Sequence, residues 1–241
     1  MDAIFDNLKA RFMALCEKNH LLKTTVVVRT RGLTAEEAIG HPDDDDFPLQ
    51  KGKECLMHAE LCGGAGQAFT DRYGDFSGTL ETVMQMPLKN NYRRAVFVST
   101  LNAALRQMRL IQGTIHCRDG EPGQCGSELA DHIKSRFGSV KITQVGFQPR
   151  MVQQLAGAFP LRLLDLDPDN IGTRKFGVQV EGPEMTEAAL RWADLLLVTG
   201  TTLVNNTIGP FLSGPPVLFY GTTIAGAAYL MEWDRFCARS T

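Results

Sequence analysis

The sequence predicts an α/β protein in which an α+β part precedes a parallel, Rossmann-like sheet covered by helices. From residue 127 onward, short apolar runs alternate with helical patterns, as in parallel β-α units. Before residue 112, helical and strand patterns follow one another without this alternation. A stretch rich in glycine and proline lies between them. We therefore expect an α+β domain at 1–112 and a Rossmann-like domain at 113–241, with a linker at 113–126.

Composition and charge exclude several classes of partner. The chain has 241 residues, of which 44% are hydrophobic, and this is ample for packed cores. Its 25 lysines and arginines against 27 aspartates and glutamates give a formal net charge of −2, so no general attraction to nucleic acid or to an anionic membrane is expected. No apolar run approaches the roughly 20 residues that cross a bilayer, and a signal-peptide layout is absent. We expect a cytoplasmic protein with reduced cysteines, and a homo-oligomer is compatible with this composition.

The first domain is predicted to begin with an amphipathic helix and a strand. Apolar residues recur at helical spacing over 2–18, and β-branched residues crowd 24–30. Three glycines within 63–66 separate the stretches 54–62 and 67–70, which predicts a hairpin. A phosphate cradle is the alternative at these glycines, but the lysine and the serine or threonine of a P-loop are absent.

A loop and two helices are predicted to follow. Two prolines and four consecutive aspartates within 39–48 predict an exposed loop. Calcium binding is the weaker alternative there, because the ligand spacing of a helix-loop-helix calcium site is missing. Helices are predicted at 78–86 and 90–110. Asn102, in the second of them, is either a surface amide or a group directed at a cleft between domains.

The predicted linker carries soft metal ligands. It holds Cys117, Cys125 and His116, and thiols and imidazoles in a reducing compartment bind zinc, copper(I), iron or an iron–sulfur cluster. Seven residues separate the two cysteines, whereas structural zinc knuckles use about two to four, so free or packed thiols are the alternative. A catalytic pair of His116 with Cys117 is disfavoured, because adjacent residues of an extended loop point in different directions.

The second domain is predicted to alternate helices and strands to its end. Helices are expected at 127–137, 151–158, 184–192, 203–212 and 225–232, and strands at 140–145, 161–167, 195–198 and 216–220. Right-handed crossovers between parallel strands place the carboxyl ends of the strands along one edge of the sheet. The polar residues that follow the strands should therefore meet there.

Four polar patches follow these strands. They are Gly146–Pro149, Asp165–Asn170, Thr199–Thr207 and Gly221–Thr223. In the third patch Gly200 permits a tight turn, and Thr201 or Thr202 is expected to cap the next helix; a capped turn without a ligand is the plain alternative. Asp165 lies about 20 residues beyond Gly146, the separation of an acidic residue that binds a ribose. The repeated glycines of a dinucleotide fingerprint are absent, however, so dinucleotide binding is disfavoured.

Three of these patches are similar to the motifs of a known family. Through Thr199-Gly-Thr-Thr-Leu-Val-Asn-Asn-Thr207, Val145-Gly-Phe-Gln-Pro149 and Asp165-Leu-Asp-Pro-Asp-Asn-Ile-Gly172, the chain resembles the heavy-metal chelation family DUF364. The resemblance is specific over residues 126–224 and looser in the first domain. It implies an enolase N-terminal-like α+β domain, a Rossmann-like domain and a ligand site in the cleft between them.

The resemblance also implies which residues line that cleft. They are Asn102, Gly146, Gln148, Asp165, Thr199, Gly200, Thr201, Thr202, Asn205 and Thr207. Asn206 departs from the family pattern, which has a glycine at this position. Cys117 and Cys125 from the linker and Cys237, expected in the last helix, are metal ligands that this chain would add.

Three functional hypotheses follow. The first is a protein that binds a metal or a small metal complex through Cys117, Cys125 and Cys237, with the 199–207 loop holding an anionic partner. The second is an enzyme for a small phosphorylated or carboxylated metabolite, which would use Asp165 and the same loop. The third is a structural or interaction module with an empty cleft.

Overall fold

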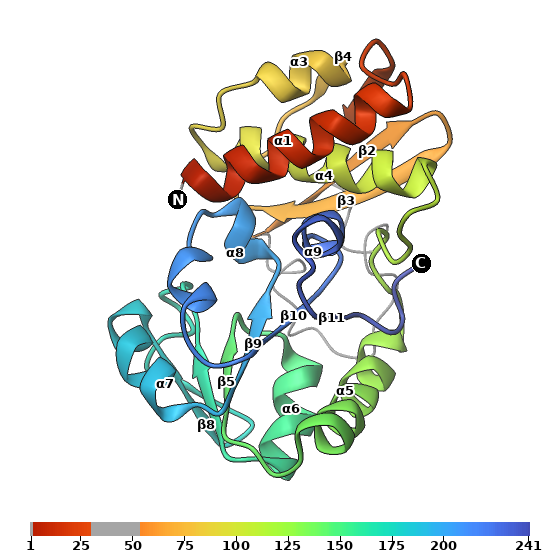
Figure 1. Ribbon diagram of the computed structural model, residues 1–241. Helices are drawn as coiled ribbons and strands as arrows, with labels where there is room; N and C mark the ends of the chain where they lie inside the picture. The colour runs from red at the N-terminus through yellow and green to blue at the C-terminus, as the bar shows by residue number, and fades with distance from the viewer. Residues whose placement is uncertain (1, 30–53) are drawn as a thin grey trace.

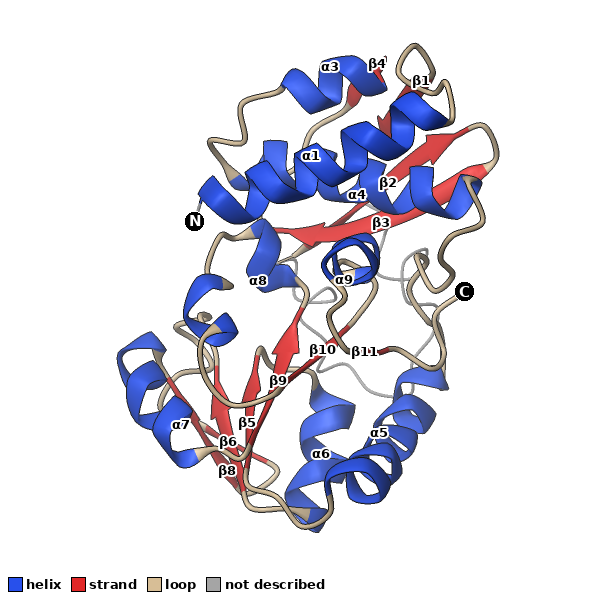
Figure 2. Cartoon of the chain, viewed as in Figure 1, coloured by secondary structure: helices blue, strands red, loops and turns tan. Residues whose placement is uncertain are grey.

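The computed structural model describes residues 2–29 and 54–241 (Figure 1). These residues form a four-stranded sheet from the first part of the chain and a seven-stranded sheet from the second (Figure 2). The predicted fold class, an α+β part followed by a parallel sheet, is thereby confirmed. The acidic loop predicted at 39–48 lies outside the described residues. Within the described ranges, no helix is both long enough and apolar enough to cross a membrane.

The N-terminal sheet is antiparallel and has the strand order β3-β2-β1-β4. Its strands are β1 (Thr25–Arg29), β2 (Cys55–Leu61), β3 (Gly64–Thr70) and β4 (Phe76–Thr79). The hairpin predicted at the glycines is confirmed, because Leu61 pairs with Gly64 across the turn. The helix predicted at 78–86 begins at Leu80 instead, since the preceding residues pair with β1.

Helix α4 (Asn91–Gln107) is buried along most of its length, between the N-terminal sheet and the second half of the chain. Two glycines of β3 allow the close approach: a Cβ atom at Gly66 would lie 2.2 Å from the backbone nitrogen of Ala103, and one at Gly64 would lie 2.4 Å from its oxygen. The polar stretch of this helix is therefore internal. Ser99, for example, is fully buried and donates its hydroxyl proton to the carbonyl of Ala95 at 2.8 Å.

The C-terminal sheet has the strand order β11-β10-β9-β5-β6-β8-β7. All neighbours are parallel except β7 and β8. Without β7, this order corresponds to the 3-2-1-4-5-6 order of doubly wound sheets. The strands are β5 (Ile142–Val145), β6 (Leu161–Leu164), β7 (Arg174–Lys175), β8 (Val178–Glu181), β9 (Leu195–Thr199), β10 (Val217–Tyr220) and β11 (Arg235–Phe236).

The helices around this sheet differ from the prediction at two places. They are α5 (Glu121–Phe137), α6 (Pro149–Ala158), α7 (Thr186–Trp192), α8 (Thr201–Val204) and α9 (Ala225–Met231). Helix α5 begins six residues before the predicted start, with Pro122 in its first turn, where a missing N–H is tolerated. The helix predicted at 203–212 is wrong: α8 ends at Val204, Asn206 has a left-handed φ of 67°, and a separate 3-10 turn spans Gly209–Leu212.

The two halves share one hydrophobic core. A single cluster of buried residues includes Phe12 and Phe97 from the first half and Leu196 and Phe219 from the second. Helix α4 packs against α8 and α9, which lie between the two sheets in Figure 1. Helix α1 (Asp2–Lys18) contacts α9 as well, and Arg11 donates to the carbonyl of Leu230 at 2.6 Å. The halves are therefore packed against each other through apolar helices.

Candidate functional site

A cavity of about 970 Å³ lies between the two halves of the chain. Its walls include the carboxyl ends of β5, β6, β9 and β10, the end of β3, and parts of the segments around residues 116–125 and 237. The switch point of a doubly wound sheet lies between its first and fourth strands, which here are β5 and β9. Nine of the ten residues that the family resemblance implies for the cleft line this cavity: Gly146, Gln148, Asp165, Thr199, Gly200, Thr201, Thr202, Asn205 and Thr207. Their role in binding a ligand stays a prediction.

Asn102 lies at the junction of the two halves. Its side chain is fully buried, and its Nδ2 donates to the carbonyls of Gln67 at 2.9 Å and of Thr222 and Thr223 at 3.2 Å. Its Oδ1 accepts the backbone N–H of Gly226 at 2.7 Å. All the hydrogen-bonding groups of this amide are therefore bound to backbone groups of the protein. Asn102 joins the two halves and does not line the cavity, whereas the resemblance implied a position facing the cleft.

The turn after β9 is held by its own threonines. Thr202 donates its hydroxyl proton to the carbonyl of Thr199 at 2.6 Å, and Thr207 donates to Oδ1 of Asn205 at 2.6 Å. The N-cap residue of α8 is Gly200, without a side-chain hydrogen bond, so the expected capping by Thr201 or Thr202 is wrong. Gly200 is required here because a Cβ atom would lie 2.6 Å from the backbone nitrogen of Ile224.

Asp165 and Gln148 fix the neighbouring strand ends. The two carboxylate oxygens of Asp165 accept the backbone N–H groups of Phe147 and Asp167, each at 2.7 Å. These bonds favour the charged form, but burial outweighs them and raises the pKa of Asp165. Gln148 caps α6 by accepting the N–H of Met151 at 2.6 Å. Both side chains thus hold the cavity wall in shape.

Four carboxyl groups line the same cavity. They belong to Glu54, Asp71, Asp165 and Asp167, and only Asp165 was a predicted site residue. Burial, followed by the negative charges of Asp165, Asp71 and Asp167, raises the pKa of Glu54 to about 7. No lysine or arginine is among the described residues that line the cavity.

Three cysteines line another part of the cavity. Cys117 lies in the segment before α5, Cys125 lies in α5, and Cys237 follows β11. The expected place of Cys237 in the last helix is wrong, because α9 ends at Met231. Burial and then the neighbouring thiols raise the pKa of Cys117, with Cys237 the larger neighbour effect and Cys125 the smaller. Burial and the charge of Cys237 likewise raise the pKa of Cys125, to about 11.

The thiols are neighbours without forming a closed metal site. Among the described residues, no group of three or more histidine, cysteine, aspartate or glutamate side chains is arranged to hold a metal ion. His116 lines the cavity too, but its Nδ1 lies 2.5 Å from the carbonyl oxygen of Cys117. Its ring packs edge-on against Phe69, and burial lowers its pKa.

Sequence reasoning missed Glu54, Asp71 and Tyr220. The two carboxyl groups lie just before β2 and just after β3, so their nearness to the strand ends of the other sheet follows only from the packing of the halves. Tyr220 ends β10, and its hydroxyl donates to the carbonyl of Gly146 at 2.8 Å. Its position at a strand end was the available signal.

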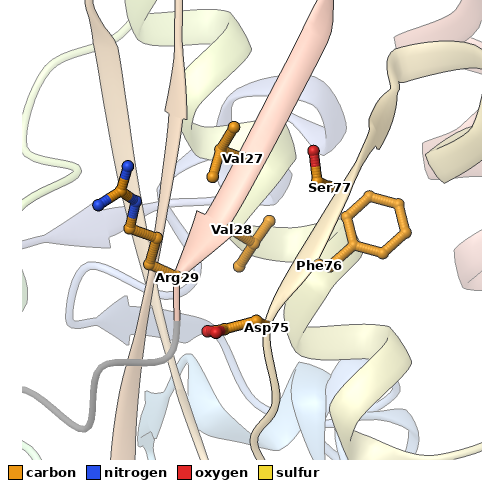
Figure 3. A pocket seen from close by; sticks show the side chains of 6 residues that line it. All are labelled: Val27, Val28, Arg29, Asp75, Phe76 and Ser77. Carbon is orange, nitrogen blue, oxygen red and sulfur yellow. The ribbon is translucent and has the colours of Figure 1, made fainter.

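A second cavity, of about 390 Å³, lies on the N-terminal sheet between β1 and β4. Its lining residues are Val27, Val28, Arg29, Asp75, Phe76 and Ser77 (Figure 3). None of the predicted site residues lies there. The larger cavity, with its thiols, carboxylates and strand-end hydroxyls, is therefore the candidate site.

Comparisons with known proteins agree with the family resemblance. Residues 128–217 match the sequence profile of the family DUF364, described as "Putative heavy-metal chelation". A solved structure of a DUF364 protein of unknown function from Pyrococcus horikoshii superposes with a TM-score of 0.55 at 14% identity, over 91% of this chain and 79% of that one. A solved structure of a DUF364 protein of unknown function from Desulfitobacterium hafniense gives a TM-score of 0.49 at 14% identity, over 73% of this chain and 72% of that one. No curated protein matches the chain.

Proposed function

We propose, from the match to a heavy-metal chelation family, that this protein binds a soft metal as part of a small metal complex in the cavity between its halves. The observation that carries the proposal is that three thiols from separate segments line one large cavity. Thiolates are the preferred ligands of soft metals such as zinc and copper(I). Cys117, Cys125 and Cys237 would hold the metal.

The size of the cavity favours a complex over a bare ion. Cavities of roughly 300–1,000 Å³ accommodate organic ligands, and this one measures about 970 Å³. The described residues offer no closed metal site. A chelator that brings its own donor atoms would complete the coordination that the thiols begin.

The charge of the walls supports a neutral or cationic complex. The carboxyl groups of Asp71 and Asp165 line the cavity among the described residues, and their negative charge disfavours an anionic complex there. This argues against the anionic partner expected at the 199–207 loop. The hydroxyls and amides of Thr201, Asn205 and Asn206 line the cavity and are uncharged, so they suit a polar neutral group.

Titration of metal-free, reduced protein tests this function. Cadmium would be added as its cationic ethylenediamine complex and, separately, as its anionic nitrilotriacetate complex, and the ultraviolet absorption of the cadmium–thiolate bond recorded. We expect saturable absorption, stronger with the cationic complex. Cys125→Ser should weaken binding at least about tenfold, which is about 1.4 kcal/mol, whereas Cys62→Ser, at an exposed cysteine, should not. Binding that is indifferent to Cys125→Ser would contradict the proposal.

The same protein preparation tests the enzyme hypothesis. A phosphorylated or carboxylated metabolite that binds the native state would raise the unfolding temperature. The carboxyl-lined walls predict no such rise for a panel of sugar phosphates and nucleotides. A saturable rise that is abolished by the double change Thr201→Val, Asn205→Ala would favour the enzyme instead.

A further inference from the structure

A buried arginine near the start of α4 connects residues of two walls of the candidate site. The Nε of Arg94 donates to the carbonyl of Val204, where α8 ends, at 2.6 Å. Its Nη1 donates to the carbonyl of Leu88 at 2.9 Å, and its Nη2 donates to Oδ1 of Asn91 at 2.5 Å. Val204 and Asn91 both line the cavity, whereas Arg94 is buried and does not. Arg94 therefore fixes residues of the cavity wall without contacting a ligand itself.

The contact with Arg94 sets the orientation of the Asn91 amide. A guanidinium only donates hydrogen bonds, so the amide oxygen of Asn91 faces Arg94 and the amide nitrogen is left for another partner. That nitrogen donates to Oδ1 of Asp71 at 2.6 Å. Arg94 thus reaches the carboxylate of Asp71 through an amide, and the carboxylate is held in place without a direct contact to the guanidinium.

The backbone around Asp71 is fixed as well. The hydroxyl of Thr70, the last residue of β3, accepts the N–H of Arg72 at 3.1 Å and donates to the carbonyl of Arg72 at 3.0 Å. Tyr92 of α4 donates its hydroxyl proton to the carbonyl of Asp75 at 2.8 Å. The loop that carries Asp71 is thus bound to α4 through its backbone as well as through its carboxylate.

Asp71 differs from its acidic neighbours in what it leaves for a ligand. Both carboxylate oxygens of Asp165 accept backbone N–H groups, and Asp167 accepts the N–H of Asp169 at 3.0 Å. In Asp71, by contrast, Oδ1 has its partner in Asn91, and Oδ2 has no hydrogen-bond partner among residues 2–29 and 54–241. Asp71 is exposed and lines the cavity. Its second oxygen is therefore suited to accept a hydrogen bond from a cationic N–H donor.

We propose that the chelator bound in the cavity is a cationic amine, that Oδ2 of Asp71 accepts a hydrogen bond from one of its N–H groups, and that Arg94 and Asn91 are positioning residues for this carboxylate. The inference rests on the proposed function, because the amine is the organic part of the metal complex. It adds the class of chelator and the residue that selects it. A carboxylate that is already held in place loses little freedom when the ligand binds, which favours affinity.

Cadmium complexes of two matched amines test the inference on metal-free, reduced protein. Ethylenediamine carries N–H groups. Tetramethylethylenediamine binds cadmium through the same pair of nitrogens and with the same charge, but it has no N–H. Binding is followed by the ultraviolet absorption of the cadmium–thiolate bond. We expect the wild-type protein to prefer the ethylenediamine complex by about tenfold, the usual effect of a hydrogen bond to a charged group.

Variants separate the hydrogen bond from the bulk of the methyl groups. Asp71→Asn should remove most of the preference by weakening the ethylenediamine complex. Asn91→Ala places a good helix former at the first residue of α4, so it should fold, and it should reduce the preference although Asp71 is intact. Arg94→Lys should reduce it too, because an ammonium lacks the planar fork that reaches three acceptors. Asp131→Asn, at an exposed position of α5 outside the cavity, is the control and should keep the wild-type preference.

The preference is the decisive measurement, because a loss of folded protein weakens the signal of both complexes alike. An unchanged preference in Asp71→Asn would overturn the inference. A wild-type preference in both Asn91→Ala and Arg94→Lys would overturn the positioning roles. If the wild-type protein binds neither complex, the proposed function fails. If it binds both complexes through its thiols but without preference, only this inference fails.

Discussion

Asn102 joins the two halves of the molecule through one amide group. Four backbone groups, from β3, from the segment before α9 and from α9 itself, converge on it. Its surroundings leave no spare volume, since a Cβ atom at Gly226 would lie 2.8 Å from its Oδ1. A buried amide with all its partners fixes a unique arrangement of the elements it connects.

The backbone of Asn206 shows why an asparagine is tolerated where the family resemblance implies a glycine. Its φ of 67° is left-handed, a conformation that glycine adopts freely and that asparagine tolerates better than most other residues. An asparagine can therefore replace the glycine without changing the turn. It also adds an amide to the cavity wall.

Glu54 should make the stability of the protein depend on pH. Burial and three neighbouring carboxylates raise its pKa from the ordinary value of 4.5 to about 7. The pKa of Glu54 is higher in the folded protein than in the unfolded chain. The protonated group therefore contributes its full stabilisation below pH 4.5, and this contribution is lost as the pH rises through about 7. Each pKa unit corresponds to about 1.4 kcal/mol, so we expect a loss of roughly 1–3 kcal/mol.

Urea unfolding at about pH 5 and about pH 8 measures this effect. The Glu54→Gln variant, neutral at both values, should lose less stability at the higher pH than the wild type does. Glu17→Gln, at an exposed position on α1, is the control and should behave as the wild type. Equal pH dependence in wild type and Glu54→Gln would contradict the assignment.

At the scale of elements, the contact between α4 and β3 organises the first half. It depends on glycines, and Gly66→Ala should be destabilising because its Cβ would lie 2.2 Å from a backbone nitrogen of α4. Overpacking of this kind costs about 1–3 kcal/mol or more. Gly157→Ala, in α6 with no atom within 4 Å of the added Cβ, is the control and should be neutral or stabilising. Equal unfolding free energies for the two variants would show that α4 can shift away from β3.

The elements that were predictable are those with strong local patterns. The apolar run of β9 and the β-branched run of β1 predict strands, and the structure has a strand at both places. The strands β7 and β11 have two residues each, too few for a period to appear, and the four residues of β8 include the polar Gln179 and Glu181, unlike the apolar run of β9. Helix α8 was predicted too long because the apolar residues Ile208, Phe211 and Leu212 continue at helical spacing beyond a left-handed residue.

The candidate site was predictable to the extent that it belongs to one sheet. Parallel topology brings strand ends together, so Gly146, Asp165 and Thr199 could be placed at one edge from sequence. Glu54 and Asp71 come from the other sheet, and their approach depends on how α8 and α9 pack against β3 and α4. No local pattern encodes that packing, which is also why the place of Asn102 was not foreseen.

For the whole molecule, the shared core predicts cooperative unfolding. The largest hydrophobic cluster extends through both halves, so the unfolding of either half exposes apolar residues of the other. Both tryptophans, Trp192 and Trp233, lie in the second half, whereas far-ultraviolet circular dichroism reports on both. The two signals should give the same urea midpoint. An earlier fluorescence transition, with part of the circular dichroism retained, would show that the first half is an independent domain.

The contact between α1 and α9 has a consequence for synthesis on the ribosome. The first helix packs on one that lies more than 200 residues later, and β11 and residues 237–241 follow that helix. Phe5 and Phe12 of α1 can pack on Phe97 of α4 early, but the part of α1 that contacts α9 stays uncovered in a nascent chain until the last elements emerge. Contacts of such long sequence separation slow folding and leave apolar surface exposed to aggregation. We expect that chains truncated before α9 need a chaperone to stay in solution.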